Sequence, residues 1–329
     1  MPEPSGPSGL VDVAITEDIW GAPLEELART RSVLRRPAAW RSQADLAQAA
    51  GQARALIVRN RSQVDAALLA ACPRLRVVGR AGVGLDNIDL AAAGEHGVVV
   101  VAPLGANAVS VAEHALGLAL ALARRTAALD RDCRDGGWDR APGRELSGGV
   151  WGLLGVGATG LATGRLAAAL GLRVIGYDPY AEAEGRAGEV ATAGIVLAPL
   201  AEVAGQASVL SCHLPASEQT RHLIDASLLA RMRPGALLVN VGRGSVVDEQ
   251  ALAAALASGQ LGGAALDVRE HEPPEPGALE RMGNVILTPH VAGITAQSQE
   301  RILRVVAADI AAVLDGRLPS AAVPTGSPR

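Results

Sequence analysis

Three residues in the second half of the chain have side chains suited to acid–base and anion chemistry: Arg243, Glu272 and His290. The Arg243 guanidinium, in the segment NVGRG, can hold a planar carboxylate through two parallel hydrogen bonds. A histidine with a carboxylate partner forms an acid–base pair, because the carboxylate orients the imidazole ring and raises its pKa. Taken singly, a surface arginine and a structural histidine are the commoner interpretations.

A short apolar run precedes each of these residues and predicts the strand that positions it. The runs are 237–241, 263–268 and 285–288, after an earlier one at 209–213. In an open parallel sheet the ligand lies outside the carboxyl ends of the strands. Polar residues gather at these ends: His213, Asn240, Arg243, Asp267 and His290. Candidate residues after successive strands favour one shared site over separate coincidences.

The stretch 150–179 predicts a complete strand–turn–helix–strand unit, with Gly155, Gly157 and Gly160 after the first strand and Asp178 after the second. Such glycines allow a tight turn, a close approach of backbone to a pyrophosphate and close helix-to-strand packing. The following helix N-terminus favours an anion. A carboxylate in the place of Asp178 bonds a ribose 2′-hydroxyl and repels a 2′-phosphate. Because no arginine follows Asp178 immediately, the sequence predicts NAD rather than NADP.

The rest of the chain repeats the alternation of strands and helices. Further strands are expected at 11–16, 55–58, 75–79 and 98–101, and helices at 24–29, 64–72, 108–125 and 297–314. This order predicts parallel sheets with covered faces. The last helix is expected to return to the first domain. A disordered start and a frayed tail at 319–329 complete the prediction.

Composition excludes several classes of function. The chain has 329 residues, a formal charge of −4 and no lysine, so Schiff-base and P-loop lysine chemistry are excluded. An acidic pI near 5.9 predicts no nucleic-acid or membrane partner. The first residues do not resemble a signal peptide. Cys72, Cys133 and Cys212 lack metal-ligand spacing and are expected to be buried thiols in a reducing cytosol.

Six segments together carry a family resemblance: RAGVGLDNIDL, GVGATG with YDPY, CHLPASEQT, NVGRG, ALDVREHEPP and TPHVAGIT. From about residue 56 to residue 300 the chain resembles the D-isomer-specific 2-hydroxyacid dehydrogenases, and most of all the phosphoglycerate dehydrogenases. The resemblance implies catalytic roles for Arg243, Glu272 and His290. It also implies a set of NAD contacts: Gly155, Gly157, Ala158, Thr159, Gly160, Asp178, Leu214, Val241, Gly242, Asp267 and Gly293.

Two departures from the family pattern are visible. Thr159 stands where isoleucine is frequent, and Arg269 stands where phenylalanine is frequent; neither is expected to touch the chemistry. The chain also ends soon after its last helix, so the C-terminal regulatory domain of longer phosphoglycerate dehydrogenases is expected to be absent.

The expected fold is a pair of doubly wound α/β domains. A Rossmann NAD domain, residues 104–293, is inserted into a flavodoxin-like substrate domain, residues 1–103 and 294–329, with the active site between them. Arg243 would bind the α-carboxylate, and His290 would protonate the ketone oxygen after hydride transfer. No metal is required, because arginine and histidine supply the positive charge. Amides of the loop Ala81, Gly82, Val83 and Gly84 would complete the grip on the carboxylate.

A second anionic group on the substrate is expected, because Arg59, Arg61 and Arg80 follow two strands of the first domain. The alternative is that Arg59 and Arg61 are solvated or paired with a carboxylate such as Asp65. A homodimer through the NAD domain is also expected, since the helix at 110–124 is apolar on nearly all sides, with Trp138 and Trp151 beside it. Other functions left open are a non-enzymatic NAD-sensing scaffold like a corepressor, and an enzyme acting on formate or phosphite.

Overall fold

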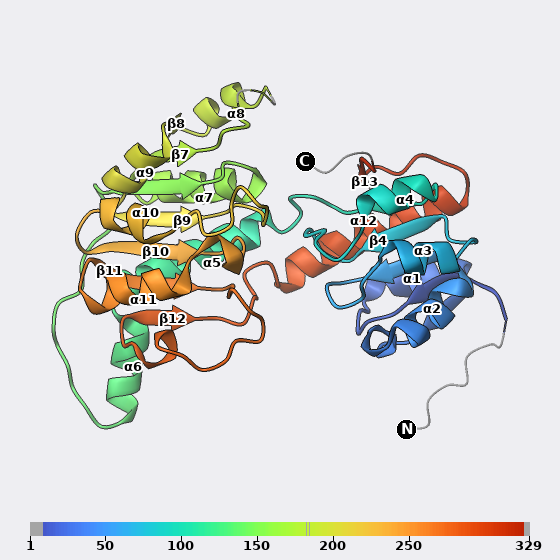
Figure 1. Cartoon of the computed structure of the whole chain (residues 1–329), viewed down its shortest axis with the longest axis horizontal. Helices are drawn as coiled ribbons and strands as arrows, with labels where there is room; N and C mark the ends of the chain where they lie inside the picture. Colours follow the sequence, from blue (N-terminus) through green and yellow to red (C-terminus); the bar gives the residue numbers. More distant parts are fainter. Residues whose placement is uncertain (1–8, 182, 184, 326–329) are drawn as a thin grey trace. The chain divides into compact units, whose positions relative to one another are not determined.

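The computed structural model describes residues 9–181, 183 and 185–325. The predicted disordered start lies mostly outside the described residues. The chain forms two compact units: unit 1 is Met1–Asn107 with Ile294–Arg329, and unit 2 is Ala108–Gly293. The predicted pair of parallel-sheet α/β folds is confirmed (Figure 1).

Unit 1 is built on a six-stranded sheet in the order β13-β5-β4-β3-β1-β2. Its strands are β1 (Val11–Ile15), β2 (Val33–Arg35), β3 (Ala53–Val58), β4 (Val77–Arg80), β5 (Val99–Val101) and β13 (Ala322–Val323). All neighbours are parallel except β13, which runs antiparallel to β5. The order β2-β1-β3-β4-β5 is the flavodoxin-like one, so the fold expected for the substrate domain is present.

Helices cover both faces of this sheet, and each face has its own apolar core. The helices are α1 (Ala22–Thr30), α2 (Gln43–Gly51), α3 (Ala66–Ala71), α4 (Leu90–Glu95) and α12 (Ala296–Leu314). Residues of α1 and α12 fill one core, and residues of α2, α3 and α4 fill the other. Helix α12 begins at a capping box formed by Thr295 and Ser298.

The tail of the chain is not frayed over residues 319–325, which corrects the prediction. Strand β13 pairs with β5, and Asp309 of α12 accepts hydrogen bonds from the main-chain N–H groups of Ser320 and Ala321 at 2.8 and 2.7 Å. The buried Asp309 carboxylate therefore fixes the tail. The last four residues of the predicted tail lie outside the described part of the chain.

Unit 2 is built on a seven-stranded parallel sheet in the order β12-β11-β10-β9-β6-β7-β8. Its strands are β6 (Val150–Leu154), β7 (Arg173–Tyr177), β8 (Ile195–Leu197), β9 (Val209–Cys212), β10 (Ala236–Asn240), β11 (Leu261–Leu266) and β12 (Val285–Leu287). The chain order reverses between β6 and β9, which makes the topological switch point of a Rossmann sheet. Leu154, Cys212, Asn240, Leu266 and Leu287 share one row of the register. Residues just after them therefore lie along one edge.

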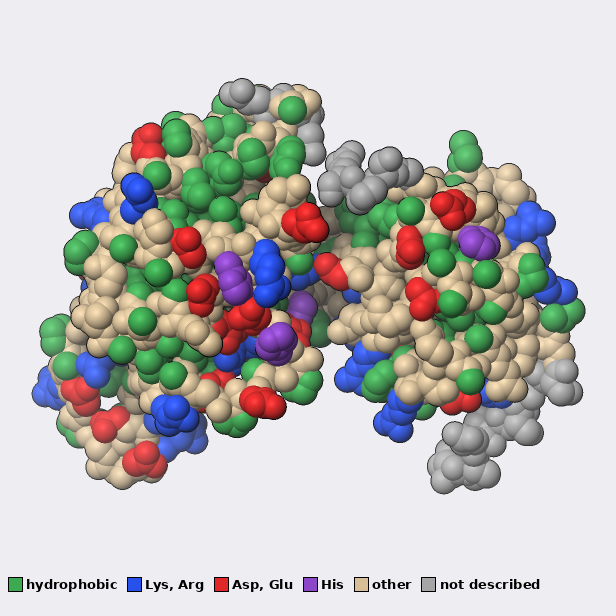
Figure 2. All heavy atoms as spheres, in the orientation of Figure 1, with side chains coloured by type: hydrophobic (Ala, Val, Ile, Leu, Met, Phe, Trp, Pro, Cys, Tyr) green, Lys and Arg blue, Asp and Glu red, His purple; other side chains and the backbone are tan. Residues whose placement is uncertain are grey.

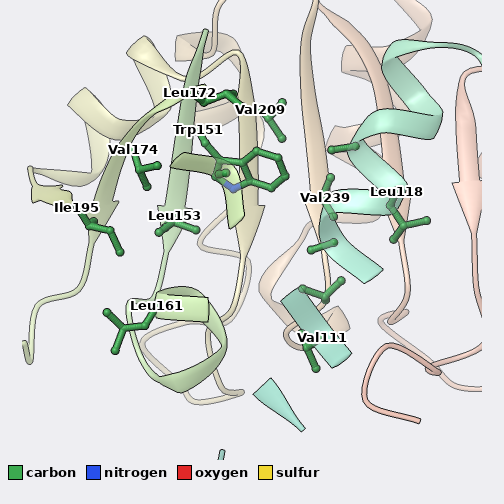
Figure 3. Packing of buried hydrophobic residues seen from close by; sticks show 14 of the residues in the cluster. Val111, Leu118, Trp151, Leu153, Leu161, Leu172, Val174, Ile195, Val209 and Val239 are labelled. Carbon is green, nitrogen blue, oxygen red and sulfur yellow. The ribbon is translucent and has the colours of Figure 1, made fainter. Parts of the chain in front are cut away.

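Helices of unit 2 also pack on both faces. Helices α5 (Ala108–Ala123) and α7 (Ala158–Ala169) fill one core; α9 (Leu200–Gln206), α10 (Ala226–Arg231) and α11 (Glu249–Ala257) fill the other. Trp151 is central to the first core, where its indole lies among Leu153, Leu172 and Val209 (Figure 3). Its Nε1–H donates to the Ser211 hydroxyl at 2.8 Å.

The structure corrects two predictions, one about exposed apolar surface near Trp151 and one about buried cysteines. Trp151 is fully buried and adds nothing to an exposed apolar surface, and eight residues of α5 are buried within unit 2. Cys72 and Cys212 are buried as expected, but Cys133 is exposed on α6 (Thr126–Arg134), a helix without buried residues. Among the residues described, no helix is long and apolar enough to cross a membrane.

Candidate active site

The glycine-rich turn lies between β6 and α7 at the switch point. Gly155 has φ +89°, which a side chain rarely adopts, and a Cβ at Gly160 would overlap the Gly155 carbonyl oxygen. By contrast, a Cβ at Gly157 would meet nothing within 4 Å, and Gly157 caps α7 without a side-chain hydrogen bond. The main chain here is open to a ligand on the side where α7 presents its first N–H groups, those of Ala158 and Thr159. These features fit a dinucleotide pyrophosphate.

The ends of β9 and β10 approach the same turn. A Cβ on Gly155 would lie 3.1 Å from the Leu214 side chain, and one on Gly242 would lie 2.8 Å from the Leu214 carbonyl oxygen. Val241 and Gly242 follow β10 directly and are buried. The structure thus brings Leu214, Val241 and Gly242 together near the glycine turn, as the resemblance implied.

Asp178 ends β7 beside the glycine turn. Its Oδ2 accepts the Val156 N–H at 3.0 Å, and its Oδ1 accepts the Tyr180 N–H at 3.0 Å. The Arg186 guanidinium also donates to Oδ2 at 3.1 Å. Asp178 therefore has an arginine partner, although no arginine follows it immediately in the sequence.

The predicted acid–base pair is formed. His290 Nδ1 donates to Glu272 Oε2 at 2.8 Å, and Glu272 Oε1 accepts the main-chain N–H of Arg269 at 3.1 Å. Both side chains reach solvent, with 46% of His290 and 39% of Glu272 exposed. Because Nδ1 is occupied by Glu272, Nε2 is the His290 nitrogen left for substrate.

Electrostatics favours a protonated His290. The hydrogen bond to Glu272 raises the pKa of His290 and outweighs both its partial desolvation and the opposing charge of Arg243. Desolvation alone would raise the pKa of Glu272, but hydrogen bonds from His290 and Arg269 lower it overall. Both shifts favour an imidazolium beside a carboxylate.

Arg243 lies on the same edge, three residues after β10. Its carbonyl oxygen accepts the Asn240 side-chain amide at 3.0 Å, and Asn240 Oδ1 accepts the Gly242 N–H at 3.1 Å. Next to it, a Cβ on Gly244 would overlap the main chain of Arg269 and Glu270. The turn that carries Arg243 therefore packs directly against the segment that carries Glu272. Sequence reasoning missed this role of Gly244, since only a close main-chain approach gives the glycine its importance.

Arg269 also has a role that the prediction missed. Its N–H bonds Glu272, and its guanidinium donates twice to Glu249, at 3.0 and 2.8 Å, and once to Glu280 at 2.5 Å. Only 9% of the side chain is exposed. The Arg269 side chain anchors the 269–272 segment without contacting Glu272 or His290, and the expectation that it does not touch the chemistry stays a prediction.

Asp267 follows β11 and is 1% exposed. Its carboxylate accepts the Thr288 hydroxyl at 2.5 Å and the N–H groups of Val291 and Ala292 at 2.9 and 2.8 Å. Desolvation raises its pKa, but these bonds and His114 together lower it. In this structure Asp267 shapes the turn at His290, and its predicted contact with NAD stays a prediction.

Figure 2 shows histidine side chains among acidic and basic ones on the surface of unit 2. His213 follows β9 directly, and the His222 N–H donates to the Ser245 carbonyl oxygen, close to Arg243, at 2.9 Å. His213 accompanies the strand ends as predicted, but its Nε2 lies 3.0 Å from Ser211 Oγ and desolvation lowers its pKa to about 3. It is therefore neutral and unsuited to proton transfer. His222 Nε2 lies 2.8 Å from Glu270 Oε1, forming a second histidine–carboxylate pair that sequence reasoning missed.

The predicted substrate residues of unit 1 lie at the ends of two adjacent parallel strands, β3 and β4, whose last residues Val58 and Arg80 pair. Glu17 accepts the N–H groups of Arg59, Arg61 and Ser62 at 2.7 to 3.2 Å and fixes the turn after β3. The Arg61 guanidinium lies 4.7 Å from the Trp40 ring centroid. Asp65 instead caps α3, so the alternative in which it pairs with Arg59 or Arg61 is not seen, whereas Arg61 is exposed, as the solvated alternative held.

Arg80 differs from these two arginines. It is only 7% exposed, and a Cβ on Gly82 would overlap its guanidinium. The side chain therefore lies against the loop Ala81, Gly82, Val83 and Gly84 rather than in solvent. Within the described part of the chain, no group of three or more histidine, cysteine, aspartate or glutamate residues could hold a metal ion.

The glycine turn, the strand-end acid and the histidine–glutamate pair define an oxidoreductase that uses a nicotinamide dinucleotide. The family model described as "D-isomer specific 2-hydroxyacid dehydrogenase, NAD binding domain" matches residues 116–292. The chain belongs to this family, and it is an NAD-dependent enzyme acting on CH–OH groups. The predicted family, cofactor and reaction class are confirmed.

Individual relatives agree. A protein named (S)-sulfolactate dehydrogenase, from Chromohalobacter salexigens, is 43% identical over 295 residues, 88% of this chain and 94% of that protein. A D-3-phosphoglycerate dehydrogenase from Archaeoglobus fulgidus is 38% identical over 80% of this chain, which spans 50% of that protein. The solved structure of the TT0316 protein from Thermus thermophilus is 32% identical, with a TM-score of 0.85 over 95% of this chain and 99% of that one.

Proposed function

We propose that this enzyme interconverts a D-2-hydroxy acid carrying a second anionic group and its 2-oxo acid, through Arg243, Glu272 and His290. One observation carries the proposal. His290 and Glu272 form a hydrogen bond of 2.8 Å on the sheet edge that bears the glycine turn, and the charge of Arg243 acts on the pKa of His290 there. This combination supplies an anion anchor and a proton donor beside a cofactor site.

Each residue has a separate task in the reduction direction. Arg243 binds the substrate carboxylate and stabilises the developing negative charge on the ketone oxygen. His290 donates a proton to that oxygen from Nε2, while Glu272 holds Nδ1 and keeps the ring protonated. The bound nicotinamide would supply the hydride. In oxidation the same groups act in reverse, so His290 must first be neutral.

The second anion is assigned to Arg59 and Arg61. Among the described residues, no carboxylate lies within ion-pair distance of either guanidinium, and Glu17 holds their main chain rigid. Arg80, in contrast, supports the loop 81–84. The relative of similar length is named for (S)-sulfolactate, a three-carbon 2-hydroxy acid with a terminal sulfonate. Sulfolactate is therefore the first substrate to test, and phosphoglycerate the second.

The test is a screen of NADH oxidation with 2-oxo acids bearing sulfonate, phosphate, carboxylate or apolar tails. Arg59→Gln and Arg61→Gln should each lower kcat/KM by roughly ten- to a hundredfold, only for substrates with the second anion. Arg41→Gln is the matched control, because Arg41 lies over the same Trp40 ring at 5.6 Å but ends the 3-10 helix Ala39–Arg41 rather than standing directly at a strand end. Equal losses with pyruvate, or NADH binding without turnover of any acid, would refute the proposal.

The proposed assembly is a cytosolic homodimer joined through unit 2. Its support is the surface of helix α6, which buries no residue in its own unit, and of Trp138, which is 81% exposed. Trp138→Ser should then weaken association. A wild-type monomer at micromolar concentration in sedimentation would contradict the dimer.

A further inference from the structure

The Asp178 carboxylate is already well supplied with hydrogen-bond donors. Val156, Tyr180 and Arg186 donate three hydrogen bonds to it, at 3.0, 3.0 and 3.1 Å, and only 8% of the side chain is exposed. A carboxylate has about four lone-pair sites. One site is therefore left, whereas a ribose offers two neighbouring hydroxyl groups.

Arg186 links two elements of the cofactor domain. Its Nη2 donates to Asp178 after β7, and its Nη1 donates to the Val156 carbonyl oxygen, within the glycine turn, at 2.8 Å. The residue directly precedes α8 (Ala187–Thr192), and a quarter of its side chain is exposed. The guanidinium thus lies between the acid that recognises ribose and the turn that approaches the pyrophosphate.

We propose that Arg186 determines cofactor specificity together with Asp178. With Asp178 present, Arg186 neutralises its charge and competes with the ribose hydroxyls for Oδ2. A 2′-phosphate brings negative charge to this place, and the Arg186 guanidinium can bind it directly. Arg186 therefore reduces the discrimination between NAD and NADP that Asp178 alone would give.

Removing either charge separates these effects. Arg186→Gln removes the guanidinium that competes with the ribose hydroxyls and that would bind a 2′-phosphate. NADH should therefore bind as tightly as before or a few-fold more tightly, while NADPH should bind more weakly. Asp178→Asn removes the repulsion of a 2′-phosphate and the ion pair between Asp178 and Arg186, so NADPH should gain. The Asp178→Asn, Arg186→Gln double variant should lose most of that gain. The gain should thus depend on Arg186.

The experiment measures NADH and NADPH affinity by fluorescence titration without any substrate, so it does not depend on the proposed function. For Arg186→Gln we expect the ratio of NADPH to NADH dissociation constants to rise by about tenfold or more, the usual effect of one charge-assisted hydrogen bond. Arg173→Gln is the matched control: Arg173 begins the same strand β7 at its opposite end and donates to Gln206. It removes the same charge and should leave the ratio unchanged.

Two outcomes would overturn the proposal. An unchanged NADPH to NADH ratio in Arg186→Gln would mean that Arg186 only supports the glycine turn. An equal gain in NADPH affinity for Asp178→Asn with and without Arg186→Gln would mean that Asp178 acts alone. A circular-dichroism melting curve for each variant separates these outcomes from partial unfolding.

Discussion

Replacing Gly244 by alanine should disable the active site without unfolding the domain. The new Cβ would overlap the carbonyl group of Arg269, which is main chain and cannot rotate away. To reach ordinary contact distance, the 269–272 segment must retreat by roughly 1 Å or more. Glu272 lies on this segment, and its bond to His290 is 2.8 Å long. A displacement of that size takes the pair beyond hydrogen-bond length.

The expected loss in kcat/KM is about a hundredfold, the usual cost of misplacing a catalytic group by about 1 Å. NADH affinity should change little, because the glycine turn and Asp178 are not involved. Gly283→Ala is the control, since a Cβ at Gly283 would meet nothing within 4 Å. A Gly244→Ala enzyme that melts like the wild type and keeps kcat/KM within twofold would refute the coupling between the two turns.

Three further predictions concern charges. Glu272 raises the pKa of His290, so the rate of reduction, which needs the imidazolium, should fall as the pH rises through that pKa. In Glu272→Gln the fall in kcat/KM should begin at a lower pH, and an unchanged pH profile would make Glu272 merely structural. Arg269→Met should lower the free energy of unfolding in urea by about 3 kcal/mol, because Glu249 loses a partly buried partner; a change under 1 kcal/mol would count against the anchor. Ending the chain after residue 319 removes the donors to the buried Asp309 and should cost about 1–3 kcal/mol in the same assay, whereas an unchanged midpoint would mean that the tail is dispensable.

Local sequence patterns predicted the elements that position the site. The strands β6 and β7, the glycine turn and the strand ends at Arg243 and His290 follow from runs of apolar residues and from glycine spacing, which are local properties. The acid–base pair was predictable because its two residues end successive strands. The position of Arg59, Arg61 and Arg80 at the strand ends of unit 1 was predictable for the same reason.

Pairings between distant residues were not predictable in this way. Gly244 and Arg269 are 25 positions apart, and nothing in either segment indicates that their main chains touch. Strand β13 is only two residues long and exists because β5 offers an open edge. The pairing of Arg186 with Asp178 depends on how the chain turns before α8. Such contacts follow from the tertiary fold rather than from propensity.

Main-chain bonding explains how His290 is held with so much of its side chain exposed. The residue has φ +55°, a left-handed conformation that costs about 1–2 kcal/mol outside glycine. Three bonds to Asp267 offset that cost: His290 N–H donates to its carbonyl at 2.7 Å, and Val291 and Ala292 N–H donate to its carboxylate. Bonds to a charged acceptor contribute about 1.5–3 kcal/mol each, so the left-handed turn is the stable state. Asp267 therefore fixes the main chain that carries His290, and Glu272 orients the ring and sets its charge.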